Sequence, residues 1–183
     1  MNEFVYCLVP AEKADFDLLA DIRQKAMKEN MEANGLFDHA LYRRYFEESF
    51  NPASTWKIVE DSEVLGFYVL WDKEDYLYLE RLYFLPKAQG RGIGAGALNT
   101  LKQQAKQQGK LIKLEVLPKS RANDFYLRHA FRLTETNSTE NTYEWGCSRR
   151  PPCNYATREV RMIFVSEILP EPATQLSCRT SEA

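Results

Sequence analysis

The sequence has few of the side chains from which proteins build metal sites. It contains two histidines, His39 and His129, and four cysteines, and no two cysteines form a C-x-x-C pair. Structural zinc sites usually draw their ligands from such closely spaced pairs. The spacing therefore gives no support to a zinc site, and we expect no metal. No cysteine is placed to act as a nucleophile either.

Long apolar runs and an excess of one charge are also missing. No run approaches the ~20 apolar residues of a membrane span. The formal net charge is −2, which argues against broad nucleic-acid binding. The N-terminal segment has no basic stretch followed by a long apolar one, so we expect no signal peptide. These features predict a cytoplasmic protein with reduced thiols and with neither a membrane nor a nucleic acid as partner.

Helix and strand patterns follow one another over residues 1–146, a length that suits one domain with its own core. Apolar spacing predicts helices over residues 14–30, 40–50, 93–108 and 121–129. It predicts strands over residues 4–9, 56–60, 64–71, 76–85, 110–117, 131–134 and 141–145. After Gly146 the sequence becomes rich in proline and polar residues, so residues 147–183 are predicted to be a C-terminal tail. Within that tail, Glu159–Val165 has the composition of one extra strand.

A glycine-rich loop joins the strand that ends near Leu85 to the helix that ends near Gln108. Its glycines are Gly90, Gly92, Gly94 and Gly96. Glycine lets successive backbone N–H groups point toward one spot, and such groups at a helix N-terminus bind phosphate. Arg91 would add a charge-assisted contact. The alternative is a tight turn with no ligand, but the number of glycines favours an anion site.

Three classes of nucleotide site compete for this loop. A P-loop needs Gly-Lys-Ser/Thr after the glycines, which the chain lacks. Gly90–Ala95 satisfies the dinucleotide pattern G-x-G-x-x-A, and Glu115 stands about where an acid would bind the ribose. However, the strands before the loop are joined as hairpins, and too little chain follows it for six parallel strands. An NAD(P)-dependent oxidoreductase is therefore the less favoured alternative.

The third class is an acetyl-CoA site. Residues 82–95 resemble the acetyl-CoA motif of the GNAT superfamily of N-acetyltransferases, with Gln89, Gly92 and Gly94 at its three key positions. The resemblance extends over about residues 4–145. It implies a single α/β domain of the α+β type, with a mixed, mostly antiparallel sheet flanked by helices. It also implies transfer of an acetyl group from acetyl-CoA to a primary amine by direct attack, for which orientation of the reactants is the main task.

The resemblance assigns cofactor-binding residues along the strand and the loop. The backbone of the strand would pair with the pantetheine arm, and the N–H groups of the loop would hold the pyrophosphate. The strand residues are Leu82, Tyr83 and Phe84, and the loop residues are Gln89, Gly90, Arg91, Gly92, Ile93, Gly94 and Ala95.

Residues 121–131 resemble a later motif of the same family, in which Ala122, Tyr126 and Phe131 match. The family's usual Asn falls on Lys119 or Ser120, and its usual Gly falls on Ala130. The match implies that Tyr126 lies near the cofactor sulfur and protonates the departing thiolate. The alternative is a core tyrosine on an amphipathic helix.

A base must take the proton of the amine, and the resemblance points to Glu80, just before the cofactor-pairing stretch. Its carboxylate would act through water; alternatively it is a strand residue paired with Arg81 or Lys57. His129 is a weaker candidate.

The family shapes its acceptor pocket with the first two helices, where acids and aromatics suit an amine with an apolar body. These residues are Glu29, Glu32, Phe37, Tyr42, Tyr45, Phe46, Glu47 and Glu48. The alternative is that most of them are core aromatics and solvated acids. The acceptor is thus expected to be a small-molecule or peptide amine, and the protein a possible homodimer. A non-catalytic acyl-CoA-binding or sensing protein is the main alternative.

Overall fold

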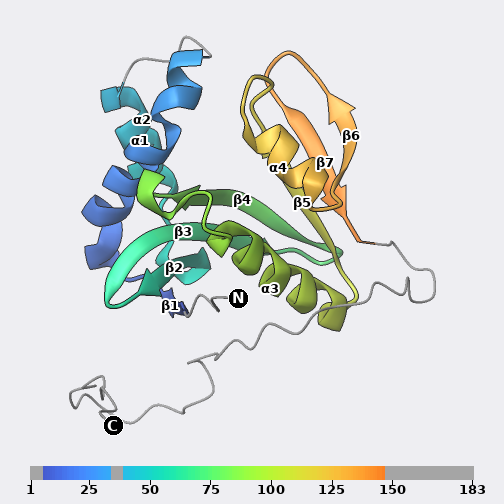
Figure 1. Ribbon diagram of the computed structural model, residues 1–183, viewed down its shortest axis with the longest axis horizontal. Helices are drawn as coiled ribbons and strands as arrows, with labels where there is room; N and C mark the ends of the chain where they lie inside the picture. The colour runs from blue at the N-terminus through green and yellow to red at the C-terminus, as the bar shows by residue number, and fades with distance from the viewer. Residues whose placement is uncertain (1–5, 34–38, 147–183) are drawn as a thin grey trace, which may run out of the picture.

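The computed structural model describes residues 6–33 and 39–146, which form one mixed sheet flanked by helices (Figure 1). The strands are β1 (Cys7–Pro10), β2 (Thr55–Glu60), β3 (Glu63–Asp72), β4 (Tyr76–Phe84), β5 (Leu111–Val116), β6 (Arg132–Thr136) and β7 (Asn141–Trp145). The α-helices are α1 (Phe16–Ala33), α2 (His39–Ser49), α3 (Ile93–Gln108) and α4 (Ala122–Arg128). There are also three single 3₁₀ turns. They are η1 (Lys13–Asp15) before α1, η2 (Pro52–Ser54) before β2 and η3 (Pro86–Ala88) before the glycine loop. The predicted tail, with Glu159–Val165, lies outside the described residues.

The sheet has the strand order β1-β2-β3-β4-β5-β7-β6. Only β4 and β5 are parallel neighbours, and every other pair is antiparallel. This confirms the predicted mixed, mostly antiparallel sheet. A dinucleotide fold needs a largely parallel sheet, so the glycine loop belongs to a different architecture. None of the helices in the described ranges is long and apolar enough to cross a membrane.

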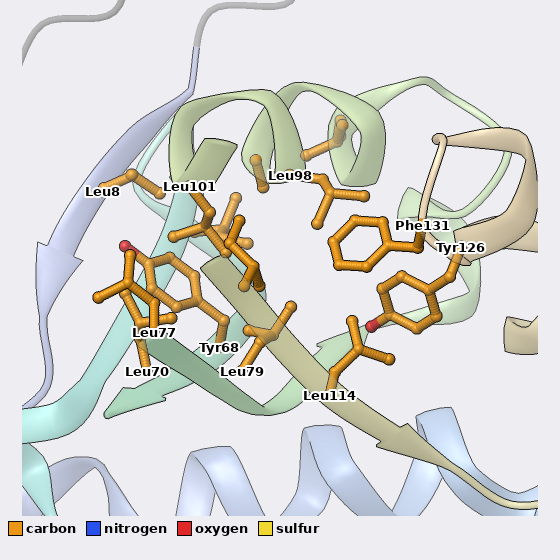
Figure 2. Packing of buried hydrophobic residues seen from close by; sticks show 14 of the residues in the cluster. Leu8, Tyr68, Leu70, Leu77, Leu79, Leu98, Leu101, Leu114, Tyr126 and Phe131 are labelled. Carbon is orange, nitrogen blue, oxygen red and sulfur yellow. The ribbon is translucent and has the colours of Figure 1, made fainter. Parts of the chain in front are cut away.

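Helices cover both faces of the sheet and divide the core into two clusters. On one face α3 and α4 pack through residues such as Leu98, Leu101 and Tyr126 onto Leu77 and Leu114 (Figure 2). The buried residues of α3 recur at helical spacing, which is why this helix lies flat on the sheet. On the other face Leu19 and Ile22 of α1 and Phe46 of α2 pack onto Phe67 and Val69 of β3.

The feature that positions the site is the parting of β4 from β5. The two strands pair only between Tyr76–Tyr78 and Leu111–Lys113, and β4 then continues to Phe84 without β5. Figure 1 shows the two strands diverging from this short contact. Leu79 pairs with Leu70 and Arg81 with Val69, so Glu80 is an extra residue, a β-bulge, at the point where the strands part. A bulge bends its strand and increases the local twist, which separates β4 from its neighbour.

Candidate active site

The glycine loop leaves its backbone open to solvent at the start of α3. Gly90 and Gly92 have φ angles of 74° and 85°, a left-handed conformation that glycine adopts at low cost. A Cβ built on either residue would have no atom within 4 Å, so the space over the loop is empty. Gly92 is the residue that caps α3. The loop can therefore approach a ligand closely with its main chain.

Three N–H groups at this end of α3 have no acceptor within the helix. The first hydrogen bond within the helix joins the Gly96 N–H to the Gly92 carbonyl at 3.0 Å. The N–H groups of Ile93, Gly94 and Ala95 precede it and have no carbonyl of the helix to bond. The positive end of the helix dipole lies at the same place. The structure thus brings together a geometry suited to a phosphate or pyrophosphate group.

Two of the predicted loop residues are held by the protein itself. The Gln89 side chain donates from Nε2 to the Phe84 carbonyl at 3.1 Å, which braces the loop against the end of β4. The Arg91 Nη2 donates to both carboxylate oxygens of Glu60 on β2, at 2.9 and 2.8 Å. The guanidinium is therefore directed toward β2, and the backbone N–H groups are what the loop presents to an anion.

The edge of β4 beyond the bulge faces the gap left by β5. Leu82, Tyr83 and Phe84 pair with β3 on one side. On the other side they pair with no strand of the described ranges. Unpaired backbone groups on a strand edge can pair with an extended chain that carries amides. Gly94 is close by, and a Cβ there would lie 3.3 Å from the Phe84 ring, so the third glycine also keeps the helix close to this strand.

Tyr126 is buried on α4, with 7% of its surface exposed. The rings of Phe125 and Phe131 lie 5.2 and 5.3 Å from its ring, centroid to centroid. In Figure 2 its phenol points from α4 toward Leu114 of β5. Burial raises the pKa of Tyr126, and the neighbouring Tyr83 raises it further. The phenol therefore stays protonated at neutral pH and can act only as a proton donor.

Glu80, the bulge residue, is fixed by two polar contacts. One carboxylate oxygen accepts a hydrogen bond from the Trp71 indole N–H at 2.5 Å, and the other lies 2.7 Å from Arg81 Nη2. The predicted alternative of a pair with Arg81 is thus found, whereas Lys57 pairs with Asp15 at 2.7 Å. The side chain of Glu80 remains 25% exposed. A carboxylate has about four lone-pair sites, so two contacts do not exhaust its capacity as an acceptor.

Glu80 and Tyr126 lie on opposite faces of the sheet. Tyr126 belongs to the cluster under α3, whereas the two partners of Glu80 lie on the face of α1 and α2: Trp71 packs there and Arg81 bonds Ser49 of α2. Tyr83 packs on the α1 and α2 face and yet influences Tyr126. Residues on the two faces of the sheet therefore come near each other where β4 and β5 part.

The loop before α4 departs from the family pattern and is held in another way. Lys119 is exposed, and the Ser120 Oγ accepts the Ala122 N–H at 3.1 Å. Asn123, which the sequence analysis missed, donates to the carbonyls of the preceding loop and accepts from the Tyr143 hydroxyl at 2.9 Å. Its position in the first turn of a helix is a signal for such side-chain to backbone bonds. Asn123 thus fixes α4, and with it Tyr126, against β7.

The structure describes part of the predicted set of acids and aromatics on the first two helices. Phe46 is fully buried in the core, so its prediction as a pocket residue was wrong. Tyr45 is 50% exposed, and Glu47 and Glu48 lie on the surface of α2. Phe37 and the side chains of Glu29 and Glu32 lie outside the described part. Over residues 6–33 and 39–146, no group of three His, Cys, Asp or Glu side chains is placed to hold a metal ion.

Comparison with known proteins agrees with this fold. The model of the acetyltransferase (GNAT) family matches residues 19–131. That match covers more than half of the chain, and the chain therefore belongs to the GNAT acetyltransferase family. No curated protein sequence matches it.

Solved structures with the same fold share little sequence with the chain. PaiA N-acetyltransferase from Thermoplasma acidophilum, solved in complex with coenzyme A, is 17% identical, with a TM-score of 0.65 over 76% of this chain and 98% of that one. An acetyltransferase from Thermus thermophilus is 19% identical, with a TM-score of 0.60 over 79% and 99%. The ribosomal-protein-S18-alanine N-acetyltransferase from Escherichia coli is 16% identical, with a TM-score of 0.57 over 76% and 91%.

Proposed function

We propose that this protein transfers an acetyl group from acetyl-CoA to the primary amine of a small molecule or peptide. The observation that carries the proposal is the open glycine loop at the N-terminus of α3, next to the unpaired edge of β4. The first presents N–H groups to a pyrophosphate, and the second presents backbone groups to an amide-bearing arm. Family membership and a neighbour solved with coenzyme A support the same ligand.

The loop and the strand edge fit the two halves of this cosubstrate. The N–H groups of residues 90–95 would hold the pyrophosphate, with Gln89 keeping the loop in place. The free edge of Leu82–Phe84 would pair with the pantetheine arm. Acetyl-CoA supplies a thioester that is already reactive toward a neutral amine, so the protein mainly has to orient the two reactants.

Glu80 and Tyr126 provide the two proton transfers. The amine nitrogen forms a bond to the acetyl carbon while the bond from that carbon to sulfur breaks. Glu80 accepts the proton of the amine, directly or through water, and Tyr126 donates its phenolic proton to the departing thiolate. Their positions on opposite faces of the sheet, with the parting of β4 and β5 between them, suit these roles because the amine and the thiolate are separate groups on the acetyl carbon, and each needs its own partner for proton transfer.

A panel of amines with acetyl-CoA tests the proposal. Release of free thiol is followed over time, and the acetylated product is identified by mass spectrometry. We expect steady thiol release that depends on the amine and yields the N-acetyl product. If acetyl-CoA binds and no amine is acetylated, the protein is instead an acyl-CoA-binding or sensing protein, the alternative that the departures at Lys119, Ser120 and Ala130 favour.

A further inference from the structure

A hollow of about 360 Å³ lies beside Glu80, where β4 and β5 are still paired. Its lining residues are Trp71, Lys73, Tyr76, Tyr78 and Glu115. Side chains alternate along a strand, and Leu77 and Leu114 face α3. Tyr78 and Glu115 therefore face the other side of the sheet, the side of Glu80. Trp71 links the hollow to Glu80, because it lines the hollow and donates its indole N–H to the Glu80 carboxylate.

Carboxylates surround one wall of the hollow, at Tyr78. The Tyr78 hydroxyl donates to the Glu115 carboxylate at 2.7 Å. Burial raises the pKa of Tyr78, and Glu115, Glu80 and Glu140 raise it further, so all three carboxylates act on this spot. The charge of Glu80 is balanced by Arg81. Glu115 forms no ion pair within the described ranges, and its charge is available to a ligand.

The aromatic walls of the hollow already contact ammonium groups. Lys113 Nζ lies 5.0 Å from the centroid of the Tyr76 ring, and Lys73 Nζ lies 5.4 Å from the centroid of Trp71. Both distances are those of cation–π contacts. Lys113 is balanced by Glu144 at 2.8 Å. Lys73 is exposed and forms no ion pair with another described residue, so its ammonium can leave the Trp71 ring when another cation arrives.

We propose that this hollow binds the distal ammonium group of a diamine acceptor while the other amine of the same molecule is acetylated beside Glu80. The assignment rests on the proposed function. The reacting amine has to be neutral and next to the parting of β4 and β5, whereas the distal group extends past Trp71 toward Tyr78 and Glu115. A distal cation gains the aromatic faces and the Glu115 charge once Lys73 has left the Trp71 ring, whereas a distal anion gains no aromatic face and meets the charge of Glu115.

Three acceptors that differ only in the distal group test the charge preference. They are an α,ω-diaminoalkane, the amino alcohol of the same length and the amino carboxylate of the same length. We expect KM for the diamine to be lower than for the amino alcohol by about tenfold, with the amino carboxylate poorest. The value of kcat should change little, because the reacting amine is the same in all three.

Variants of the hollow should shift this preference in opposite directions. Glu115→Gln should remove most of the difference between diamine and amino alcohol. Lys73→Met should lower KM for the diamine, because it removes the competing ammonium from Trp71. Asp61→Asn, in the exposed turn before β3 and at the opposite end of that strand from Trp71, carries the same change of charge away from the hollow and should leave the preference intact.

Direct binding separates failure of this inference from failure of the proposed function. The indole N–H resonance of Trp71, assigned with Trp71→Phe, is followed by NMR while each acceptor is added without acetyl-CoA. A shift with the diamine that exceeds the shift with the amino alcohol supports the hollow even if no amine is turned over. Equal KM values for all three acceptors, or a preference for the carboxylate, overturn the inference while acetyl transfer stands. Absence of both turnover and a Trp71 shift overturns both.

Discussion

Tyr83 on β4 lies close enough to Tyr126 on α4 to add to the rise in the Tyr126 pKa that burial causes first. Tyr83 packs on the face of α1 and α2, and Tyr126 packs on the face of α3. β4 leaves β5 after Tyr78, which leaves a gap beside Tyr83 on that edge of β4. The same gap is where the acetyl group has to lie if the protein is an acetyltransferase. Burial keeps the Tyr126 phenol protonated, as its proposed role as an acid requires.

Replacement of Tyr126 by Phe removes this acid and keeps the ring. General acid catalysis contributes about 10²–10⁴-fold, and we expect a fall in kcat near the low end because a thiolate is a tolerable leaving group. Affinity for acetyl-CoA should hold. Steady-state kinetics with an accepted amine, together with calorimetry of acetyl-CoA binding, measure the two effects.

Tyr68→Phe is the control, since Tyr68 is also a buried phenol on the α3 face but stacks on Trp56 of β2. It should leave kcat unchanged. Parent-like turnover in Tyr126→Phe would make Tyr126 a core residue only. Weaker acetyl-CoA binding with unchanged kcat would mean that its hydroxyl binds the cosubstrate.

Ala130→Gly should stabilise the protein. Ala130 ends α4 with a φ of 58°, a left-handed conformation that costs a non-glycine residue roughly 1 kcal/mol. Glycine adopts it readily, although it also gains freedom in the unfolded chain. We expect the free energy of unfolding, from urea denaturation, to rise by about 0.5–1 kcal/mol. Ala26→Gly, inside α1, should instead lower it by about as much. A less stable Ala130→Gly variant would show that Ala130 is not strained.

Asp15 should make stability depend on pH. Its burial alone would raise its pKa, but hydrogen bonds from Lys57 and Glu12 and the Lys57 charge together lower it. A carboxyl with a lowered pKa in the folded state stabilises the fold above its unfolded pKa, and this stabilisation is lost as the pH falls through the folded value. Asp15→Asn should therefore lower the free energy of unfolding by about 1 kcal/mol at pH 7 and by little near pH 3.

Urea denaturation of Asp15→Asn and the parent across this pH range makes the measurement. Glu74→Gln, in the exposed turn between β3 and β4, is the control and should have no comparable effect at either pH. If the difference in free energy of unfolding between Asp15→Asn and the parent stays constant with pH, the loss of stability comes from packing rather than from charge.

Local patterns predicted the elements well where the signal lies in neighbouring residues. The helix predicted to end at Gln108 does so, because Gly109 takes the left-handed conformation of a C-terminal cap, with a φ of 65°. The predicted hairpin of β2 and β3 has Asp61 and Ser62 as its turn residues. Both have a positive φ, as a two-residue hairpin turn requires. The strand Asn141–Trp145 has its predicted limits.

The geometry of the site depends on contacts that no local pattern encodes. The bulge at Glu80 arises from the register between β3 and β4, and nothing in the sequence around Glu80 signals an extra residue. Arg91 is directed to Glu60, which is distant in the sequence, so no local pattern predicts this direction. The hollow at Tyr78 needs the parallel contact with β5 to bring Glu115 across from another strand. The resemblance to the family predicted which residues have a role in the site, whereas their positions follow from the pairing of the strands in the sheet.

The central claim is that the open loop before α3 holds acetyl-CoA. In Gly92→Glu a side chain with negative charge occupies the space over the loop, in a residue with a φ of 85°. Gly109→Glu imposes the same backbone strain and the same charge at the other end of α3, where a Cβ also meets no atom within 4 Å. Circular dichroism of both variants is the check that each keeps the fold.

Calorimetric titration of acetyl-CoA, NADPH and NADH into the parent protein and these two variants tests the claim most directly. We predict that the parent and Gly109→Glu bind acetyl-CoA and neither dinucleotide. Gly92→Glu should bind acetyl-CoA at least about 100-fold more weakly, because its carboxylate opposes the pyrophosphate. NADPH binding without acetyl-CoA binding in the parent, or equal acetyl-CoA affinity in a folded Gly92→Glu variant, would contradict it.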